Sequence, residues 1–199
     1  MEYRRLEFGD LPIETEALAK ALLGVVLVRD SIAGRTAGRI VETEAYTIGD
    51  PASHAYRGPR PRNASMFLDP FHAYVYLIYG TNFCFNVTSE SRHQGAAVLV
   101  RALEPVDGID LMKRRRRTEV LRDLCRGPGR LAQALEIDRS LDGRRLLEDR
   151  ELWLAHPLRA GGPIGVSRRI GITRAAQRRL RFYERGNPFV SGPRALSPS

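Results

Sequence analysis

The chain has 199 residues, of which 43% are hydrophobic, enough for one globular domain with its own core. It carries a net charge of +9, and only two of its 32 basic residues are lysines, Lys20 and Lys113. This balance favours a polyanionic partner such as nucleic acid. No apolar run reaches the roughly 18 residues of a membrane span, and charges interrupt the first ten residues, which excludes a signal peptide there.

The cysteines and histidines form no metal-binding or disulfide pattern. Cys84 and Cys125 lie far apart and lack CxxC spacing, and the four histidines lack HExxH or paired spacing. We therefore expect no metal, no cofactor and no disulfide framework. Together with the charged N-terminus, this composition predicts a cytoplasmic protein that does not interact with membranes.

In chain order, the first predicted element is an amphipathic helix over residues 11–23, where Leu, Ile and Ala recur along one stripe. Five segments rich in β-formers then predict strands. A loop rich in Gly, Pro, Ser and Arg, over residues 47–65, separates the second strand from the third. The predicted strands are 25–28, 38–46, 73–79, 83–88 and 96–103, and the third and fourth form a hairpin around residues 80–82.

The second half of the chain predicts shorter elements. Residues 108–124 contain helical turns with an exposed arginine run at 114–117, and residues 129–135 form a short helix after Pro128. Late strands are predicted over 151–155 and 181–185. Because strands follow one another closely with few βαβ units, the pattern predicts an α+β fold with a mainly antiparallel sheet, a single domain over residues 1–199.

Two carboxylates on the second predicted strand are candidates for catalysis. Alternation along a strand places Glu42, Glu44 and Tyr46 on one face, with neighbours about 6.6 Å apart. A partly buried carboxylate beside another carboxylate resists ionisation, which tunes an acid or base toward neutral pH. The triplet alone is explained more simply by two surface acids on a solvated edge strand.

Aromatic residues gather in the same region, because nine of the fifteen lie between residues 46 and 85. Tyr74 and Tyr76 share a strand face, whereas Tyr79 points the other way and precedes Gly80 at the hairpin tip. A tyrosine at such a tip is a candidate wedge between base pairs, although sheet packing is the simpler explanation. Stacking rings, an acid that can activate water and a basic surface together indicate chemistry on a nucleobase.

Eight segments carry a resemblance that runs in order along nearly the whole chain. They are GRIVETEAY at 38–46, His54, PRNASMF at 61–67, YVYLIYG at 74–80, FCFNV at 83–87, VLVRALEP at 98–105, RGPGRL at 126–131 and RFYERGNPFVSG at 181–192. Together they resemble the alkyladenine DNA glycosylase family, also called 3-methyladenine or methylpurine DNA glycosylases.

The resemblance implies a fold, a reaction and residue roles. It implies a curved antiparallel sheet with a protruding DNA-inserting hairpin. It also implies a monomer that flips alkylated or deaminated purines (the 3-methyladenine, 7-methylguanine, hypoxanthine and ethenoadenine class) out of double-stranded DNA and leaves an abasic site. The implied roles are a general base at Glu44, sandwiching rings at Tyr46 and Tyr76, a pocket edge at His54, a DNA-intercalating residue at Tyr79, a gate against guanine at Asn86 and a supporting residue at Arg101.

Two other functions stay open from the residues alone. One is a non-catalytic nucleic-acid-binding module in which Glu44 is inert. The other is an O-glycoside hydrolase that uses Glu42 and Glu44. The many arginines argue against this function, because binding of a neutral sugar gains nothing from a basic surface. Lys20 and Lys113 belong to no site motif, so the scarcity of amines predicts a monofunctional enzyme that uses water instead of a Schiff base.

Overall fold

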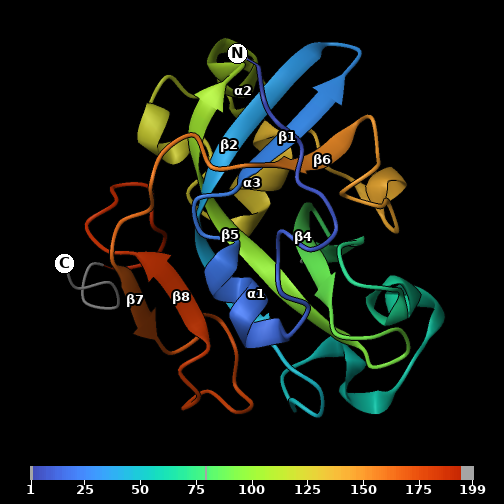
Figure 1. Cartoon of the computed structure of the whole chain (residues 1–199). Coiled ribbons are helices and arrows are strands. Elements are labelled where there is room, and N and C mark those ends of the chain that lie inside the picture. Colours follow the sequence, from blue (N-terminus) through green and yellow to red (C-terminus); the bar gives the residue numbers. More distant parts are fainter. Residues whose placement is uncertain (1, 79, 194–199) are drawn as a thin grey trace.

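The structure is a computed structural model that describes residues 2–78 and 80–193 (Figure 1). Within these ranges every strand pair is antiparallel, and one sheet has the order β3-β4-β5-β2-β1-β6, with β8 paired to β2 and β7. The predicted α+β fold is therefore confirmed. The strands are β1 (Val26–Ser31), β2 (Gly34–Tyr46), β3 (Ala73–Ile78), β4 (Asn82–Ser89), β5 (Ala96–Asp107), β6 (Leu152–Ala155), β7 (Ile164–Ser167) and β8 (Arg181–Glu184).

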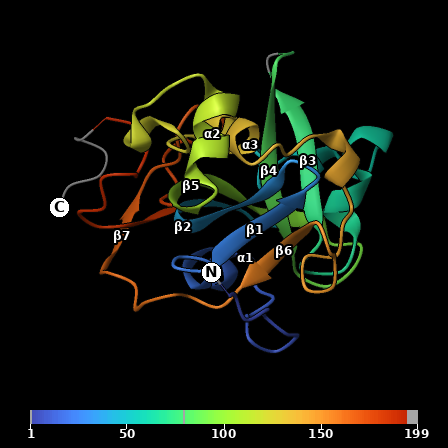
Figure 2. The ribbon, with the colours of Figure 1, turned by 90° about the horizontal axis from the view of Figure 1, so that it is seen from above.

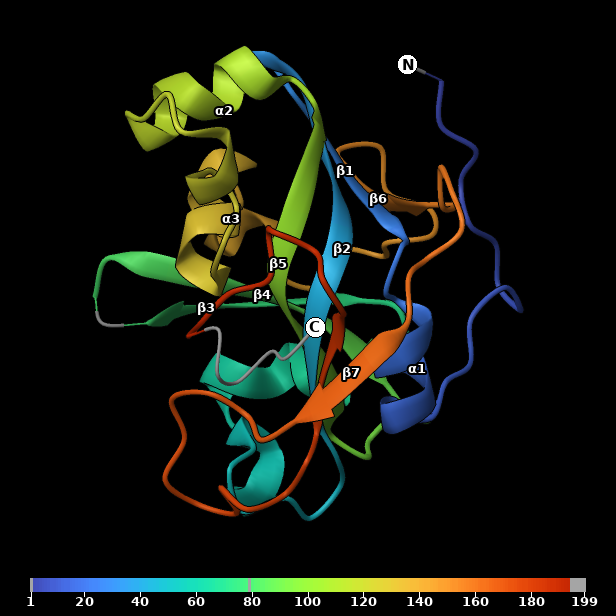
Figure 3. The same cartoon turned by 90° about the vertical axis from the view of Figure 1, so that its left-hand side faces the viewer.

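Helices cover both sides of this sheet. Figures 2 and 3 show α2 and α3 on one side of the central strands β2 and β5, and α1 on the other. None of the helices in the described ranges is long and apolar enough to cross a membrane. The helices are α1 (Thr15–Ala21), α2 (Ile109–Arg116) and α3 (Pro128–Ala134), with 3-10 helices η1 (His54–Arg57), η2 (Pro61–Phe67), η3 (Leu121–Asp123) and η4 (Arg139–Leu141).

The first helix is shorter than the hydrophobic pattern predicts. Pro12 disfavours helical backbone at Leu11, and α1 begins only at Thr15, whose backbone N–H donates to the Glu90 carboxylate at 2.8 Å. The chain leaves the helix through Gly24, which has φ +94°. Leu11 and Ile13 therefore pack into the hydrophobic core from outside the hydrogen-bonded turns of the helix.

Strand β2 lies inside the sheet, not at its edge. Around residues 42–44 it pairs with β5 on one side and β8 on the other. Register shifts against β5 between Ile40 and Thr43 mark bulges that bend the strand. Because neighbours flank it on both sides, the interpretation of Glu42 and Glu44 as acids on a solvated edge strand is wrong.

The predicted hairpin is formed by β3 and β4, which pair from Ala73 with Val87 to Ile78 with Asn82. Figure 2 shows this pair running alongside α3, which contacts β4. Tyr79, the predicted tip residue, lies outside the described residues. Helix α3 begins at Pro128 after Gly127, and its buried Leu131 packs into the core, which brings the start of the helix toward the hairpin.

Three sequence predictions need correction. Residues 47–65 contain η1 and most of η2, so this segment is not one plain loop. Strand β7 was not predicted, because Gly165 interrupts its short run of β-formers. The glycine is required there, since an added Cβ would meet the Tyr183 ring at 2.3 Å. The arginine run is only partly exposed, since Arg115 donates to the Ala134 carbonyl at 3.1 Å and Arg116 to the Leu124 carbonyl at 3.1 Å.

Candidate active site

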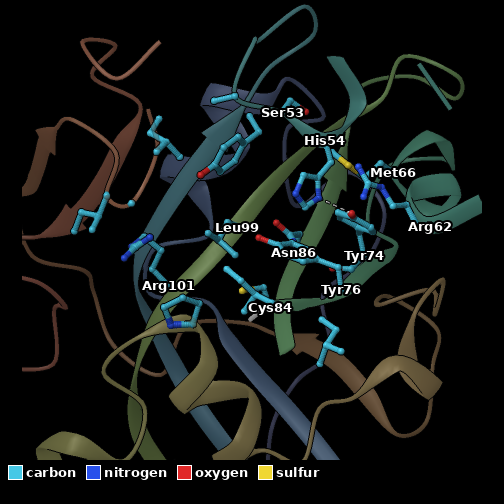
Figure 4. A pocket seen from close by; sticks show the side chains of 18 of the residues that line it. Ser53, His54, Arg62, Met66, Tyr74, Tyr76, Cys84, Asn86, Leu99 and Arg101 are labelled. Carbon is cyan, nitrogen blue, oxygen red and sulfur yellow. Dashed lines mark hydrogen bonds between the residues drawn. The ribbon is translucent and has the colours of Figure 1, made fainter. Parts of the chain in front are cut away.

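A cavity of about 860 Å³ opens where β2, η1, β3, β4 and β5 meet (Figure 4). Five of the predicted site residues line it: Tyr46, His54, Tyr76, Asn86 and Arg101. The sixth, Glu44, is fully buried behind this lining and contacts two of the five. The fold thus brings together every predicted site residue that the structure describes.

Three groups from separate segments hold the Glu44 carboxylate. The Tyr46 hydroxyl donates to one oxygen at 2.9 Å, and the Ile170 backbone N–H donates to the other at 2.8 Å. The Arg101 Nη1 lies 3.2 Å from that second oxygen. Burial raises the pKa of the Glu44 carboxyl above its ordinary value, although Arg101 and the two donors act in the opposite direction.

The neighbouring Glu42 carboxylate is saturated with donors. The Nε atoms of Arg101 and Arg181 donate to one oxygen at 2.9 Å and 2.7 Å, and the Ser191 backbone N–H donates to the other at 2.6 Å. Burial acts to raise the pKa of Glu42, but the two guanidiniums and the Ser191 N–H hold it below its ordinary value. The pKa values of the two adjacent carboxyls are thus moved in opposite directions, that of Glu44 upward and that of Glu42 downward.

Aromatic rings form the opposite wall of the cavity. The Tyr74 and Tyr76 rings lie 5.4 Å apart between centroids, and His54 packs edge-on against Tyr76 at 4.5 Å. Nδ1 of His54 shares a hydrogen bond of 2.8 Å with the Tyr74 hydroxyl, drawn in Figure 4. Desolvation and then the charge of Arg62 lower the pKa of His54, so the imidazole is neutral near pH 7.

Asn86 lines the cavity beside Tyr74 and is buried. It pairs across the sheet with Tyr74, and its amide Nδ2 donates to the Tyr74 carbonyl at 2.9 Å. This bond fixes the plane of the Asn86 amide against the cavity, so a planar molecule that enters meets a rigid side chain.

Comparisons with known proteins agree with this geometry. Residues 10–188 match the family model described as methylpurine-DNA glycosylase. The chain belongs to the methylpurine-DNA glycosylase family. A Mesorhizobium japonicum protein, provisionally named a 3-methyladenine DNA glycosylase, is 58% identical over 94% of this chain and 90% of its own length. The DNA-3-methyladenine glycosylases of mouse and human are 48% and 46% identical over 93% and 94% of this chain, covering 60% and 67% of their own lengths.

Family membership confirms the predicted resemblance and the enzyme class. A methylpurine-DNA glycosylase is a DNA N-glycosylase, a hydrolase that acts on DNA in base excision repair. The two alternatives, a non-catalytic binding module and an O-glycoside hydrolase, are therefore set aside. The large excess of arginine fits a protein of this family, because a DNA substrate offers a row of phosphates.

The sequence did not predict one segment of this candidate site, residues 169–172. Ile170 reaches Glu44 across 126 positions of the chain, and Ile170, Gly171 and Ile172 line the cavity. Arg169 lies over the Tyr46 ring, with its guanidinium carbon 4.6 Å from the ring centroid. No motif marks this stretch, since its contribution is one backbone N–H and one arginine among many, so only the fold reveals it.

Proposed function

We propose that this enzyme, acting as a monomer in the cytoplasm, flips alkylated or deaminated purines from duplex DNA into the cavity and hydrolyses their N-glycosidic bond with water. The substrate class comprises 3-methyladenine, 7-methylguanine, hypoxanthine and ethenoadenine. The observation that carries the proposal is the buried Glu44, with a raised pKa, held beside a cavity walled by aromatic rings.

Flipping is required because the bond to the sugar cannot be reached while the base is stacked inside a duplex. Rings on both sides of an extruded base return part of the unstacking cost, about 1–3 kcal/mol for each base–aromatic contact. Tyr46 and Tyr76 both line the cavity and are the rings we assign to this sandwich. Tyr79 is the residue we assign to the space left in the duplex.

Cleavage of the N-glycosidic bond builds positive oxocarbenium character on the sugar. An ionised Glu44 stabilises this charge and accepts a proton from the attacking water. Arg101, bonded to both Glu42 and Glu44, holds the carboxylate in place. A purine alkylated at position 3 or 7 is already cationic, so it leaves without a strong general acid.

The remaining cavity residues are assigned to recognition. His54, neutral and fixed by Tyr74, lies at the cavity edge near the base and its sugar. Asn86 is assigned to exclude the exocyclic amine of normal guanine, since its amide is locked by the Tyr74 carbonyl and cannot turn away. Arg62 and Arg139 also line the cavity and offer cations to the DNA backbone.

The direct test is incubation with duplex DNA that carries one 7-methylguanine or hypoxanthine, followed by alkali. Strand breaks confined to the lesion support base release, and the same duplex without a lesion is the control. Tight binding without alkali-labile sites would contradict the proposed hydrolysis.

The rate of 7-methylguanine release is expected to fall on acidification at a pH above the ordinary glutamate pKa of about 4.3. Glu44 acts as a base only when ionised, and burial raises its pKa. The cationic base needs no proton to leave, so single-turnover rates against pH report on titrating groups of the enzyme and not of the base. A rate that stays constant down to about pH 4.3 would argue against Glu44 as the base.

Borohydride added during turnover is expected to trap no covalent protein–DNA adduct. Lys20 lies over the Phe182 ring, and Lys113 pairs with Glu119 at 3.0 Å, so neither is among the residues that line the cavity. The measurement is a denaturing gel of labelled lesion duplex after reduction. A strong adduct that disappears in Lys20→Ala or Lys113→Ala would overturn the water mechanism.

A further inference from the structure

The Tyr46 ring has a buried cation behind it. The Arg169 guanidinium carbon lies 4.6 Å from the ring centroid, within the range of a cation–π contact. The Tyr46 hydroxyl is bonded to Glu44, so the ring cannot turn freely. Since the Arg169 side chain is inaccessible to solvent and covers one face of the ring, a base in the cavity can stack only on the other face.

Asp50 holds this cation in place. Its carboxylate pairs with Arg169 through both Nη atoms, the longer contact being 3.2 Å, and both side chains are fully buried. Arg169 also donates to the Ala45 carbonyl at 2.9 Å. The Arg169 Nε is buried without a hydrogen-bond partner in the described part of the chain, so hydrogen bonding alone does not account for where the guanidinium lies.

The pair matters for the charge that a stacked base experiences. A base on the open face of Tyr46 would lie within about 10 Å of the guanidinium, where unit charges in a protein interior still interact appreciably. An unpaired guanidinium would therefore repel a cationic purine but not a neutral one. Asp50 cancels that repulsion, because it places a negative charge directly on the guanidinium.

We propose that the Asp50–Arg169 pair is a specificity-determining element, which stiffens Tyr46 from behind and keeps its stacking face equally open to cationic and neutral purines. The inference rests on the proposed function, since it requires that Tyr46 stacks on the flipped base. Asp50 and Arg169 are positioning residues, because they act on the base through the Tyr46 ring.

A purely structural role for the pair predicts a different result. The pair also ties the segment after β2 to residue 169, so its loss could loosen the site as a whole. Loosening would weaken the binding of every lesion alike, whereas an uncompensated charge changes the preference between a cationic and a neutral lesion. If removing the anion and removing the cation change this preference in opposite directions, the charge mechanism is supported, because loosening does not produce that result.

The test compares the affinities for two uncleavable lesion duplexes, one with cationic 7-methylguanine and one with neutral ethenoadenine. A 2′-fluoro sugar on the lesion blocks cleavage because fluorine destabilises the oxocarbenium. The variants are Asp50→Asn, Arg169→Gln and the double variant. Asp69→Asn, which removes a carboxylate from the exposed pair with Arg92, is the matched control.

Asp50→Asn is expected to shift the affinity ratio against the cationic lesion by about fivefold or more. Arg169→Gln should shift the ratio in favour of the cationic lesion, by less, because Arg178 still lies 3.9 Å from Asp50. The double variant removes one negative and one positive charge, so the site keeps the net charge of the wild type. Its affinity ratio should therefore return to within about twofold of the wild-type ratio. If Asp50→Asn does not fold, the Arg169→Gln and double variants still test the sign and the restoration.

If the folded variants bind both lesion duplexes equally more weakly, or if their affinity ratio is unchanged, the inference is overturned. The Asp50–Arg169 pair then has only a structural role. Failure of the proposed function looks different. In that case the wild type itself would bind lesion duplex no better than undamaged duplex, and no ratio would exist to shift.

Discussion

Glu44→Gln is expected to lower the rate of base release by at least the ~10²–10⁴-fold typical of losing a general base, while DNA binding is retained. Glutamine keeps the size of the side chain, and its amide oxygen can still accept from the Ile170 N–H, while its amide nitrogen takes the place of the oxygen that accepts from the Tyr46 hydroxyl. It cannot take a proton from water. Single-turnover release of 7-methylguanine and the affinity for lesion duplex, measured on the same preparation, separate the two effects.

The stability of this variant gives an independent check. Because the pKa of Glu44 is raised in the fold, its ionisation is disfavoured there, and this cost grows as pH rises from the ordinary value through the raised one. Removing the charge should leave the melting temperature at pH 7 unchanged or higher. A variant that stays within a few-fold of wild-type activity would remove Glu44 from the mechanism.

Local patterns predicted much of the site because strand alternation is a local property. Glu44 and Tyr46 are two residues apart on β2, and the structure places their side chains in contact. Tyr74 and Tyr76 are two apart on β3, and their rings lie together. The roles given to these residues came from the family resemblance and stay predictions.

The rest depends on contacts that no local pattern encodes. Burial of Glu44 requires that β8 pair with β2 on the side away from β5, and β8 follows some 140 residues later. The contact of Arg169 with Asp50 spans 119 positions. An arginine that closes a buried pair has the same local sequence context as one on the surface, and this chain has many arginines to choose from.

Glu42→Gln is expected to lower the stability of the protein more than the rate of base release, the opposite of what is expected for Glu44→Gln. It leaves Arg101 and Arg181, both buried, facing a neutral amide in place of their shared carboxylate. Breaking a buried ion pair by removing one partner costs about 3–5 kcal/mol. For a chain of this size that corresponds to a fall in melting temperature of roughly 6–20 °C.

The pH dependence identifies the cause of this loss. The pKa of Glu42 is lowered in the fold, so its stabilisation is fully present above the ordinary glutamate pKa and disappears as pH falls through the lowered value. The difference in melting temperature between wild type and Glu42→Gln should therefore be largest near neutral pH and shrink on acidification. Glu42→Asp, which keeps the charge, should lose less stability than Glu42→Gln. A Glu42→Gln enzyme that is as stable as wild type but inactive would mean that the roles of the two carboxylates are exchanged.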